Sequence, residues 1–116
     1  MTRHDDTVRL RHMLDHAREA AELVQNKSRG ELDADRVLSL ALVHLLEIVG
    51  EAASRVSNDL RVRHPQIAWT QIVSLRNRLI HGYDAVDLDI LWQILQDDLP
   101  ELITRLDRLV LSEDEA

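Results

Sequence analysis

The chain of 116 residues contains no cysteine and no phenylalanine, and it has only three glycines and two prolines. Without cysteine, disulfide bonds and thiolate zinc sites are excluded, and a reducing compartment is permitted. So few glycines and prolines leave little turn chemistry for a β-rich fold, and they favour long helices. Apolar residues make up 45% of the chain, which excludes disorder by composition.

Targeting and membrane-spanning segments are also missing from the sequence pattern. The first ten residues, MTRHDDTVRL, are charged and hold no apolar stretch of the kind that a secretory signal needs. The most apolar run, VLSLALVHLLEIVG, is interrupted by His44 and Glu47 and is shorter than a bilayer-spanning helix. We therefore expect a soluble, cytoplasmic protein with no membrane partner.

Acidic residues are absent from one segment, Leu60–Tyr83, although the whole chain carries a formal net charge of −7. Four arginines lie in this segment, so the other 92 residues carry a net charge of −11. An acidic body argues against loose, non-specific binding of nucleic acid. A single basic segment within that body favours a local phosphate-binding site.

The spacing of apolar residues predicts an all-α, up-and-down bundle of four to five helices in a single domain, residues 1–116. The first helix is expected over residues 5–26 and the second over 34–56, where Asp33 is a candidate N-cap. The second helix is apolar on nearly all sides, so we expect it at the centre. Gly50 would weaken it, and another helix is therefore expected to approach closely there.

The third helix is expected over residues 68–81, after a loop at 57–66 and before Gly82, a natural residue just past a helix end. On an ideal helical wheel it has two apolar faces, although a helix of a small bundle needs only one. The second apolar face predicts contact with a second copy of the chain, in a homodimer. This face consists of Trp69, Val73 and Ile80.

The remaining residues are predicted to form one or two further helices. A helix over residues 88–97 would begin at Asp87, which is a good N-cap. Pro100 kinks this helix or begins a fifth one, because proline lacks the backbone donor that a helix interior needs. Residues 112–116 are expected to form a frayed tail.

The end of the predicted third helix gathers polar side chains in the sequence RNRLIHGY, residues 76–83. On an ideal helix Arg76 and His81 lie about 140° apart. They converge only if the helix end unwinds at Gly82, or if both line a cleft against a second protomer. Asn77 and His81 are four residues apart and share a face.

This segment resembles the Arg-x4-His-x-Tyr motif of HEPN-domain proteins, in their HepT-like toxin branch. The flanking segments GEAASRVS (50–57), HPQIAW (64–69) and VDLDILWQILQDDLPEL (86–102) are also similar to that branch. The likeness covers most of the chain in element order. It implies a ribonuclease toxin, active as a homodimer and held in check by a nucleotidyltransferase antitoxin that attaches AMP to the motif tyrosine, Tyr83.

The residues allow the chemistry that the resemblance implies, which is metal-independent cleavage of RNA by attack of the 2′-OH on the adjacent phosphate. His81 can transfer the proton, and Arg76 can hold phosphate oxygens with a permanent, bidentate charge. These two are the predicted catalytic residues, with no metal and no cofactor. Asn77 and Arg78 are candidate supporting residues. Glu47 and Glu51 lie on the helix expected to be buried, where a glutamate needs a cation partner. Arg76 or Arg78 is a candidate partner, so Glu51 could orient the site.

Several alternatives stay open. The motif residues could be ordinary groups at a solvated helix end, where cations are favourable. A second function class is a non-catalytic HEPN module that binds a nucleotide or a nucleotidyltransferase partner, and a third is a helical oligomerisation domain with a vestigial site. His-x-x-acid pairs begin at His12, His16 and His44, but their order is the reverse of that in di-metal bundles. The RNA target, tRNA or mRNA, is not encoded in any of these patterns.

Overall fold

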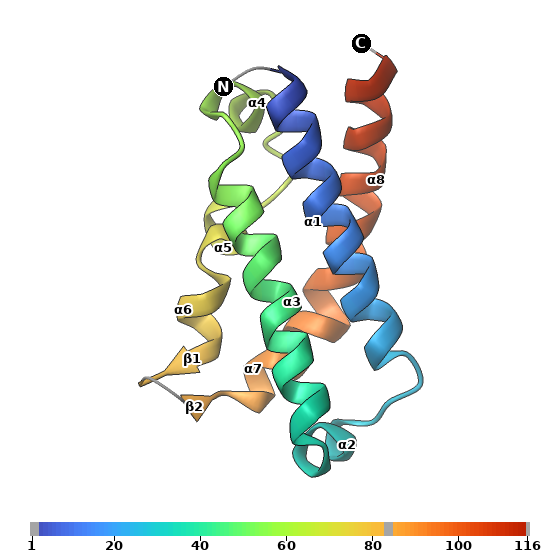
Figure 1. Cartoon of the computed structure of the whole chain (residues 1–116), viewed down its shortest axis with the longest axis vertical. Helices are drawn as coiled ribbons and strands as arrows, with labels where there is room; N and C mark the ends of the chain where they lie inside the picture. The colour runs from blue at the N-terminus through green and yellow to red at the C-terminus, as the bar shows by residue number, and fades with distance from the viewer. Residues whose placement is uncertain (1–2, 83–84, 116) are drawn as a thin grey trace.

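The structure is a computed structural model that describes residues 3–82 and 85–115, so Tyr83 lies outside the described residues. The predicted all-α fold is confirmed, with a two-stranded β-ribbon in addition. Three long helices stand side by side in Figure 1, and α1 begins at the end of the molecule where α8 stops. The elements are α1 Arg3–Val24, α2 Arg29–Ala34, α3 Arg36–Ser54, α4 Asn58–Arg63, α5 Trp69–Val73, α6 Leu75–Leu79, β1 Ile80–His81, β2 Ala85–Val86, α7 Leu88–Gln93, the π-helical turn η1 Ile94–Asp98, and α8 Leu99–Glu115.

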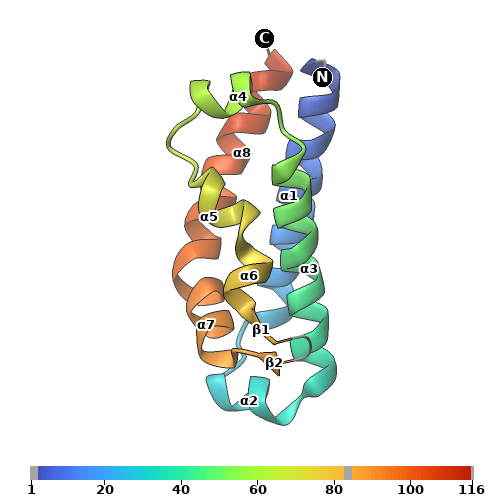
Figure 2. The same cartoon turned by 90° about the vertical axis from the view of Figure 1, so that its left-hand side faces the viewer.

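The hydrophobic core lies between α1, α3 and α8, and α5 and α6 also pack against α3 (Figure 2). Leucine supplies most of the largest fully buried side chains, such as Leu42 and Leu46 of α3 and Leu106 of α8. Burying one such side chain contributes about 1.5–3 kcal/mol, which is a large share of the stability of a small domain. The central position predicted for the second helix is confirmed, because α3 contacts α1, α2, α5 and α6.

Two large apolar side chains of α3 are exposed and are not part of the core. Val37 and Leu40, near its start, are 78% and 49% exposed. The apolar run VLSLALVHLLEIVG was expected to be too short to span a bilayer. The helix that contains it has 19 residues, and by length and composition alone it could cross a membrane. The helix is also the central core helix of the bundle, and a core helix passes the same test without spanning a bilayer.

α3 and α5 approach each other closely at a glycine. A Cβ atom on Gly50 would lie 2.9 Å from the backbone oxygen of Ile72, closer than real Cβ atoms come. The predicted close approach of another helix at Gly50 is therefore confirmed. This contact sets the distance between α3 and the segment α5–α6.

Two short helices, α2 and α4, lie where the sequence predicted a polar break and a loop. The hydroxyl of Ser28 caps α2 by accepting a hydrogen bond from the backbone N–H of Glu31 at 3.3 Å. Because Asp33 belongs to α2, it is not the N-cap of the following helix. Asp35 caps α3 instead, and its carboxylate accepts from the backbone N–H of Leu38 at 3.0 Å.

α4 is attached to the start of α1 by a buried carboxylate. Asp6 is 4% exposed and accepts hydrogen bonds from the backbone N–H of Ser57 at 2.8 Å and from its hydroxyl at 2.6 Å. The same hydroxyl accepts from the backbone N–H of Leu60 and so caps α4. The loop expected at residues 57–66 is therefore wrong over residues 58–63, where α4 lies with its cap held by Asp6.

The expected continuous helix over residues 68–81 is also wrong. It breaks at Ser74 into α5 and α6, and it ends at Leu79 because Ile80 is extended, with φ −109° and ψ 120°. Gly82 has φ +74°, a conformation that favours glycine, and the chain then returns as β2. Unwinding of the helix end, one of the two arrangements considered for bringing Arg76 and His81 together, is therefore present, and it begins before Gly82.

The second apolar face predicted for the third helix is not a free surface. Trp69 is buried, and its indole N–H donates a hydrogen bond to the backbone oxygen of His64 at 3.0 Å. Val73 and Ile80 are partly buried and pack against the core. The helical wheel predicted this exposed face wrongly because it assumed one unbroken helix. The homodimer prediction loses its original support with this face.

From Leu88 to Glu115 the chain is helical, with the π-helical turn η1 between α7 and α8. Asp87 caps α7 as predicted. Pro100 is the second residue of α8, so of the two alternatives the one in which this proline begins a further helix is confirmed. The frayed tail expected at residues 112–116 is wrong as far as Glu115, because α8 continues to that residue. Glu113 is buried, 3.6 Å from the guanidinium of Arg63 on α4.

Candidate functional site

An open cleft of about 430 Å³ lies between α3 and the segment α5–α6. Gly50, one of its lining residues, is where α3 and α5 approach each other closely. Its lining mixes charges of both signs with amide, hydroxyl and apolar groups. The lining residues are His44, Glu47, Ile48, Gly50, Glu51, Ser54, Val73, Arg76 and Asn77.

Arg76 of α6 faces a carboxylate across this cleft. Its Nε atom lies 3.6 Å from Oε2 of Glu47 on α3, and its side chain is 71% exposed. An exposed ion pair of this kind stabilises a protein by only about 0–1 kcal/mol. A phosphate that enters the cleft can therefore replace the carboxylate as the partner of the guanidinium. Asn77 lines the cleft beside Arg76, and its supporting role stays a prediction.

His81 lies on the β-ribbon and is not one of the residues that line the cleft of Arg76. Its Nε2 atom is 3.5 Å from Oδ2 of Asp87, and its side chain is 61% exposed. The ribbon pairs His81 with Ala85, which holds the histidine backbone in an extended conformation. Within one chain the two predicted catalytic residues thus occupy neighbouring elements without sharing one cleft.

Arg78 lies on the other side of α6 from this cleft. It donates a hydrogen bond from Nη2 to Oδ2 of Asp98 in η1 at 3.2 Å. Both residues line a separate, smaller pocket of about 110 Å³ between α5–α6, η1 and α8. The structure therefore gives Arg78 a contact between helices, and it does not bring this arginine together with Arg76.

The predicted role of Glu51 as a buried partner for a motif arginine is wrong. Its side chain is 65% exposed and accepts a hydrogen bond from Nε of Arg55 on the same helix at 3.0 Å. The carboxylate that meets Arg76 is that of Glu47, one turn earlier on α3. Both glutamates lie on one face of the helix, so the sequence offers no signal that selects Glu47. Only the distance between α3 and α6 does so.

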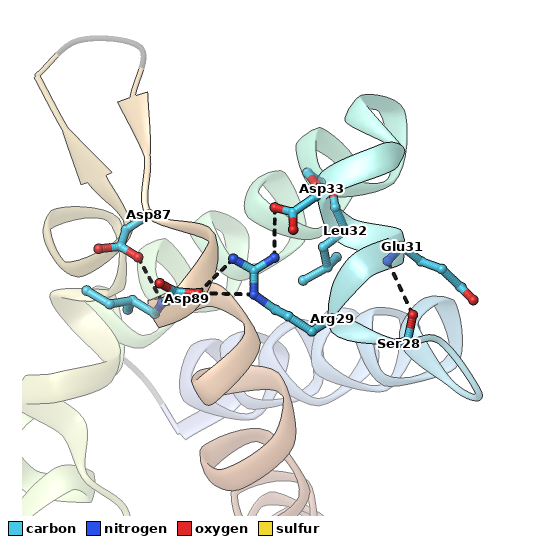
Figure 3. A network of polar contacts seen from close by, with 9 residues as sticks. Ser28, Arg29, Glu31, Leu32, Asp33, Asp87 and Asp89 are labelled. Carbon is cyan, nitrogen blue, oxygen red and sulfur yellow. Dashed lines mark hydrogen bonds and ion pairs between the residues drawn. The ribbon is translucent and has the colours of Figure 1, made fainter.

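A polar network holds the first turn of α7, next to Asp87 (Figure 3). Arg29 of α2 donates from Nη1 to Asp33 at 2.9 Å and from Nη2 to Asp89 at 2.7 Å. These hydrogen bonds raise the pKa of the Arg29 guanidinium, and the one to Asp33 has the larger effect. The network ties α2 to α7, and the sequence analysis missed this tie because Arg29 and Asp89 are 60 positions apart.

We looked for a cluster of metal-ligating side chains among the residues that the structure describes. No three histidine, aspartate or glutamate side chains there come together in a group that could hold a metal ion. In the His-x-x-acid pairs of α1, Nδ1 of His16 lies 2.6 Å from the backbone oxygen of His12. That ring nitrogen is occupied by a local contact within the helix.

The family model described as "Ribonuclease HepT-like" matches residues 13–109, which include the cleft and the β-ribbon. The chain belongs to the HepT-like ribonuclease family. A "Probable ribonuclease HepT" of Thermococcus cleftensis is 33% identical to this HepT-like chain over 100 residues, which cover 83% of the chain and 91% of the relative. A "Putative RNase" of Methanocaldococcus jannaschii is 32% identical over 102 residues, with coverage of 88% and 94%. No solved structure matches the chain.

The family predicted from the sequence RNRLIHGY and its flanks is therefore confirmed. In this HepT-like chain the motif spans two kinds of structure, since Arg76 lies on a helix and His81 on a strand. Each has a carboxylate neighbour, Glu47 for the arginine and Asp87 for the histidine. The motif thus offers an exposed cation and an exposed imidazole, each held by an acidic residue from a different helix or loop.

Proposed function

We propose that this HepT-like protein is a metal-independent endoribonuclease in which Arg76 and His81 are the catalytic residues. Membership of a ribonuclease family over residues 13–109 carries the proposal. The exposure of the Arg76 guanidinium and of the His81 imidazole supports it, because both groups are accessible to a polymer such as tRNA or mRNA.

The proposed reaction needs a base, an anion-binding group and an RNA 2′-OH. The imidazole of His81 takes the proton of the 2′-OH, whose oxygen then forms a bond to the adjacent phosphorus. The bond from phosphorus to the 5′ oxygen breaks, and that oxygen leaves as a hydroxyl with a proton from water. Arg76 neutralises the extra negative charge on the phosphate oxygens, and Asn77 in the same cleft positions the phosphate.

The proposed active form is a homodimer, but on a different surface from the one first expected. The outer face of α3 carries exposed Val37 and Leu40, and at 100° per residue His44 and Ile48 lie on the same side. This stripe runs directly into the cleft that holds Arg76. Two copies of α3 packed about a two-fold axis would bury the stripe and bring two clefts, each with its own Arg76, together in one site.

Control by a partner protein is part of the same proposal. The family resemblance implies a toxin–antitoxin pair in the cytoplasm, in which a nucleotidyltransferase antitoxin attaches AMP to Tyr83. In the sequence Tyr83 is two residues after His81, next to Gly82. One or more AMP groups there would add bulk and negative charge beside the catalytic residues and compete with RNA for arginine.

The alternative is a non-catalytic HEPN module that binds a nucleotide or the nucleotidyltransferase. One observation favours it, namely that His81 does not line the cleft of Arg76 within a single chain. Cleavage of RNA by the purified protein separates the two functions, because a binding module would bind RNA or nucleotide without producing new ends.

Purified protein should cut RNA in the presence of EDTA and leave 2′,3′-cyclic phosphate ends, and its expression alone should slow the growth of a bacterial host. Arg76→Ala and His81→Ala should each abolish both effects without changing the helical circular dichroism. Arg18→Ala is the matched control, because Arg18 is another exposed arginine in an ion pair, with Asp107 on the α1–α8 side. Activity that survives His81→Ala, or that EDTA removes, would contradict the proposed chemistry.

Modification of Tyr83 has its own test, by intact mass after incubation with the cognate nucleotidyltransferase and ATP. The mass should rise in steps of one AMP, RNA cleavage should fall in parallel, and Tyr83→Phe should gain no mass. Modification of any other residue would remove this form of regulation and leave the ribonuclease proposal standing.

A further inference from the structure

Asp87 uses its two carboxylate oxygens for two different contacts. Oδ1 accepts a hydrogen bond from the backbone N–H of Ile90 at 3.0 Å and so caps α7. Oδ2 lies 3.5 Å from Nε2 of His81. The helix cap needs only one oxygen of the side chain, so the second oxygen is free to meet the imidazole while the first fixes its direction.

The backbone brings these two residues together independently of their side chains. His81 is the last residue of β1, and Asp87 follows β2 directly. The ribbon is closed by pairing of Ile80 with Val86 and by a hydrogen bond of 2.8 Å from the backbone N–H of Asp87 to the oxygen of Leu79. Main-chain contacts therefore hold the backbones of His81 and Asp87 near each other.

The first turn of α7 is held from the other side by the network of Figure 3. Oδ1 of Asp89 accepts from both Nε and Nη2 of Arg29, at 3.2 and 2.7 Å. A planar guanidinium that makes two such contacts fixes orientation as well as distance. Because Asp89 is two residues from Asp87, this tie to α2 limits movement of the helix start away from the β-ribbon.

We infer that Asp87 is a positioning residue for His81. Its carboxylate holds the imidazole as the tautomer with hydrogen on Nε2, so that Nδ1 is the nitrogen free to accept the proton of the 2′-OH. A carboxylate beside one ring nitrogen selects the tautomer and stabilises the imidazolium that forms when the other nitrogen takes a proton. The catalytic part of this inference rests on the proposed ribonuclease function, whereas the tautomer does not.

The test replaces Asp87 with asparagine, which caps a helix as well as aspartate does but carries no charge. Asp35→Asn is the matched control, because Asp35 caps α3 through the same kind of contact, to the backbone N–H of Leu38 at 3.0 Å. Both variants lose one charge at a helix start, so circular dichroism and thermal melting should change to a similar extent. Only Asp87→Asn removes the neighbour of His81.

The decisive readout is the nitrogen-15 spectrum of the His81 ring in full-length protein without RNA, at mildly alkaline pH, with His81→Gln assigning the signals. Wild type and Asp35→Asn should show hydrogen on Nε2 and a bare Nδ1, and Asp87→Asn should show an exchanging mixture. In RNA cleavage, Asp87→Asn should lower kcat by about 10- to 100-fold, the range found for carboxylate partners of metal-bound histidines, with little change in KM.

Identical ring spectra for wild type and Asp87→Asn would overturn the inference, as would equal losses of kcat in Asp87→Asn and Asp35→Asn. If the wild type cuts no RNA at all, the ribonuclease proposal fails, and the ring spectra still decide whether Asp87 sets the tautomer of His81. The two failures are therefore distinguishable from one set of proteins.

Discussion

Replacing Gly50 with alanine tests the contact that sets the width of the candidate cleft. The new Cβ would lie 2.9 Å from the backbone oxygen of Ile72, and also 3.7 Å from that of Val73. A backbone atom at the end of α5 cannot move aside as a side chain can. The segment α5–α6 must therefore shift relative to α3, and Arg76 must shift with it.

The expected loss of stability follows from two opposing terms. Alanine in a helix interior is favoured over glycine by about 1 kcal/mol. Overpacking a tight contact costs about 1–3 kcal/mol, and the upper half applies where the neighbour is backbone. The net loss is about 1–2 kcal/mol, which lowers the Tm of a domain of this size by roughly 4–12 °C.

Gly30→Ala is the matched control, because Gly30 is also helical. A Cβ atom added there would have the Ser28 hydroxyl as its nearest neighbour, at 3.9 Å. This substitution should raise stability by about 0.5–1 kcal/mol.

Since a displacement of 1 Å can cost about 100-fold in rate, a shift of a few tenths of an ångström in Gly50→Ala should lower kcat about 4- to 10-fold. A Tm at or above that of the wild type in Gly50→Ala would refute the close approach of α3 and α5.

Three further substitutions test other parts of the structure. Asp6→Ala leaves the backbone N–H and hydroxyl of Ser57 without their acceptor, so denaturant unfolding should show a loss of about 1–3 kcal/mol, and a loss below about 0.5 kcal/mol would contradict the buried cap. In Gly82→Ala the new Cβ has no neighbour within 4 Å, but the alanine must adopt φ +74°, so stability should fall by about 1–2 kcal/mol and RNA cleavage should fall with it. Unchanged stability would show that residue 82 does not need this conformation. Leu40→Glu should convert the proposed dimer to a monomer in light scattering at micromolar concentration, and a dimer that persists would exclude the α3 interface.

The long helices could be predicted because their signals are local and repeated. In the first helix Leu10, Met13, Leu14 and Ala17 recur at helical spacing, and all four are buried in α1. Asp87 was predictable as an N-cap for a similar reason, since a side chain that caps a helix needs only its own next few residues.

The break at Ser74 could not be predicted, because no glycine or proline marks it. Ile72, Leu75 and Leu79 fit an unbroken helix by spacing, and all three are buried in the broken one. In the broken helix α5 approaches Gly50 on α3, a tertiary contact that helical spacing does not encode. The pairing of Arg76 with Glu47 and not with Glu51 is a tertiary contact of the same kind.

The place where helical periodicity fails is also the place where the proposed chemistry lies, as expected where function competes with regular structure. In a helix continued through residue 81, His81 would point about 140° away from Arg76. Ending the helix at Leu79 moves His81 onto the β-ribbon, where main-chain pairing brings it to the carboxylate of Asp87. The early end of the helix therefore gives His81 a charged neighbour. A substitution that makes Ile80 and His81 helical should break the contact between His81 and Asp87, even if it stabilises the bundle.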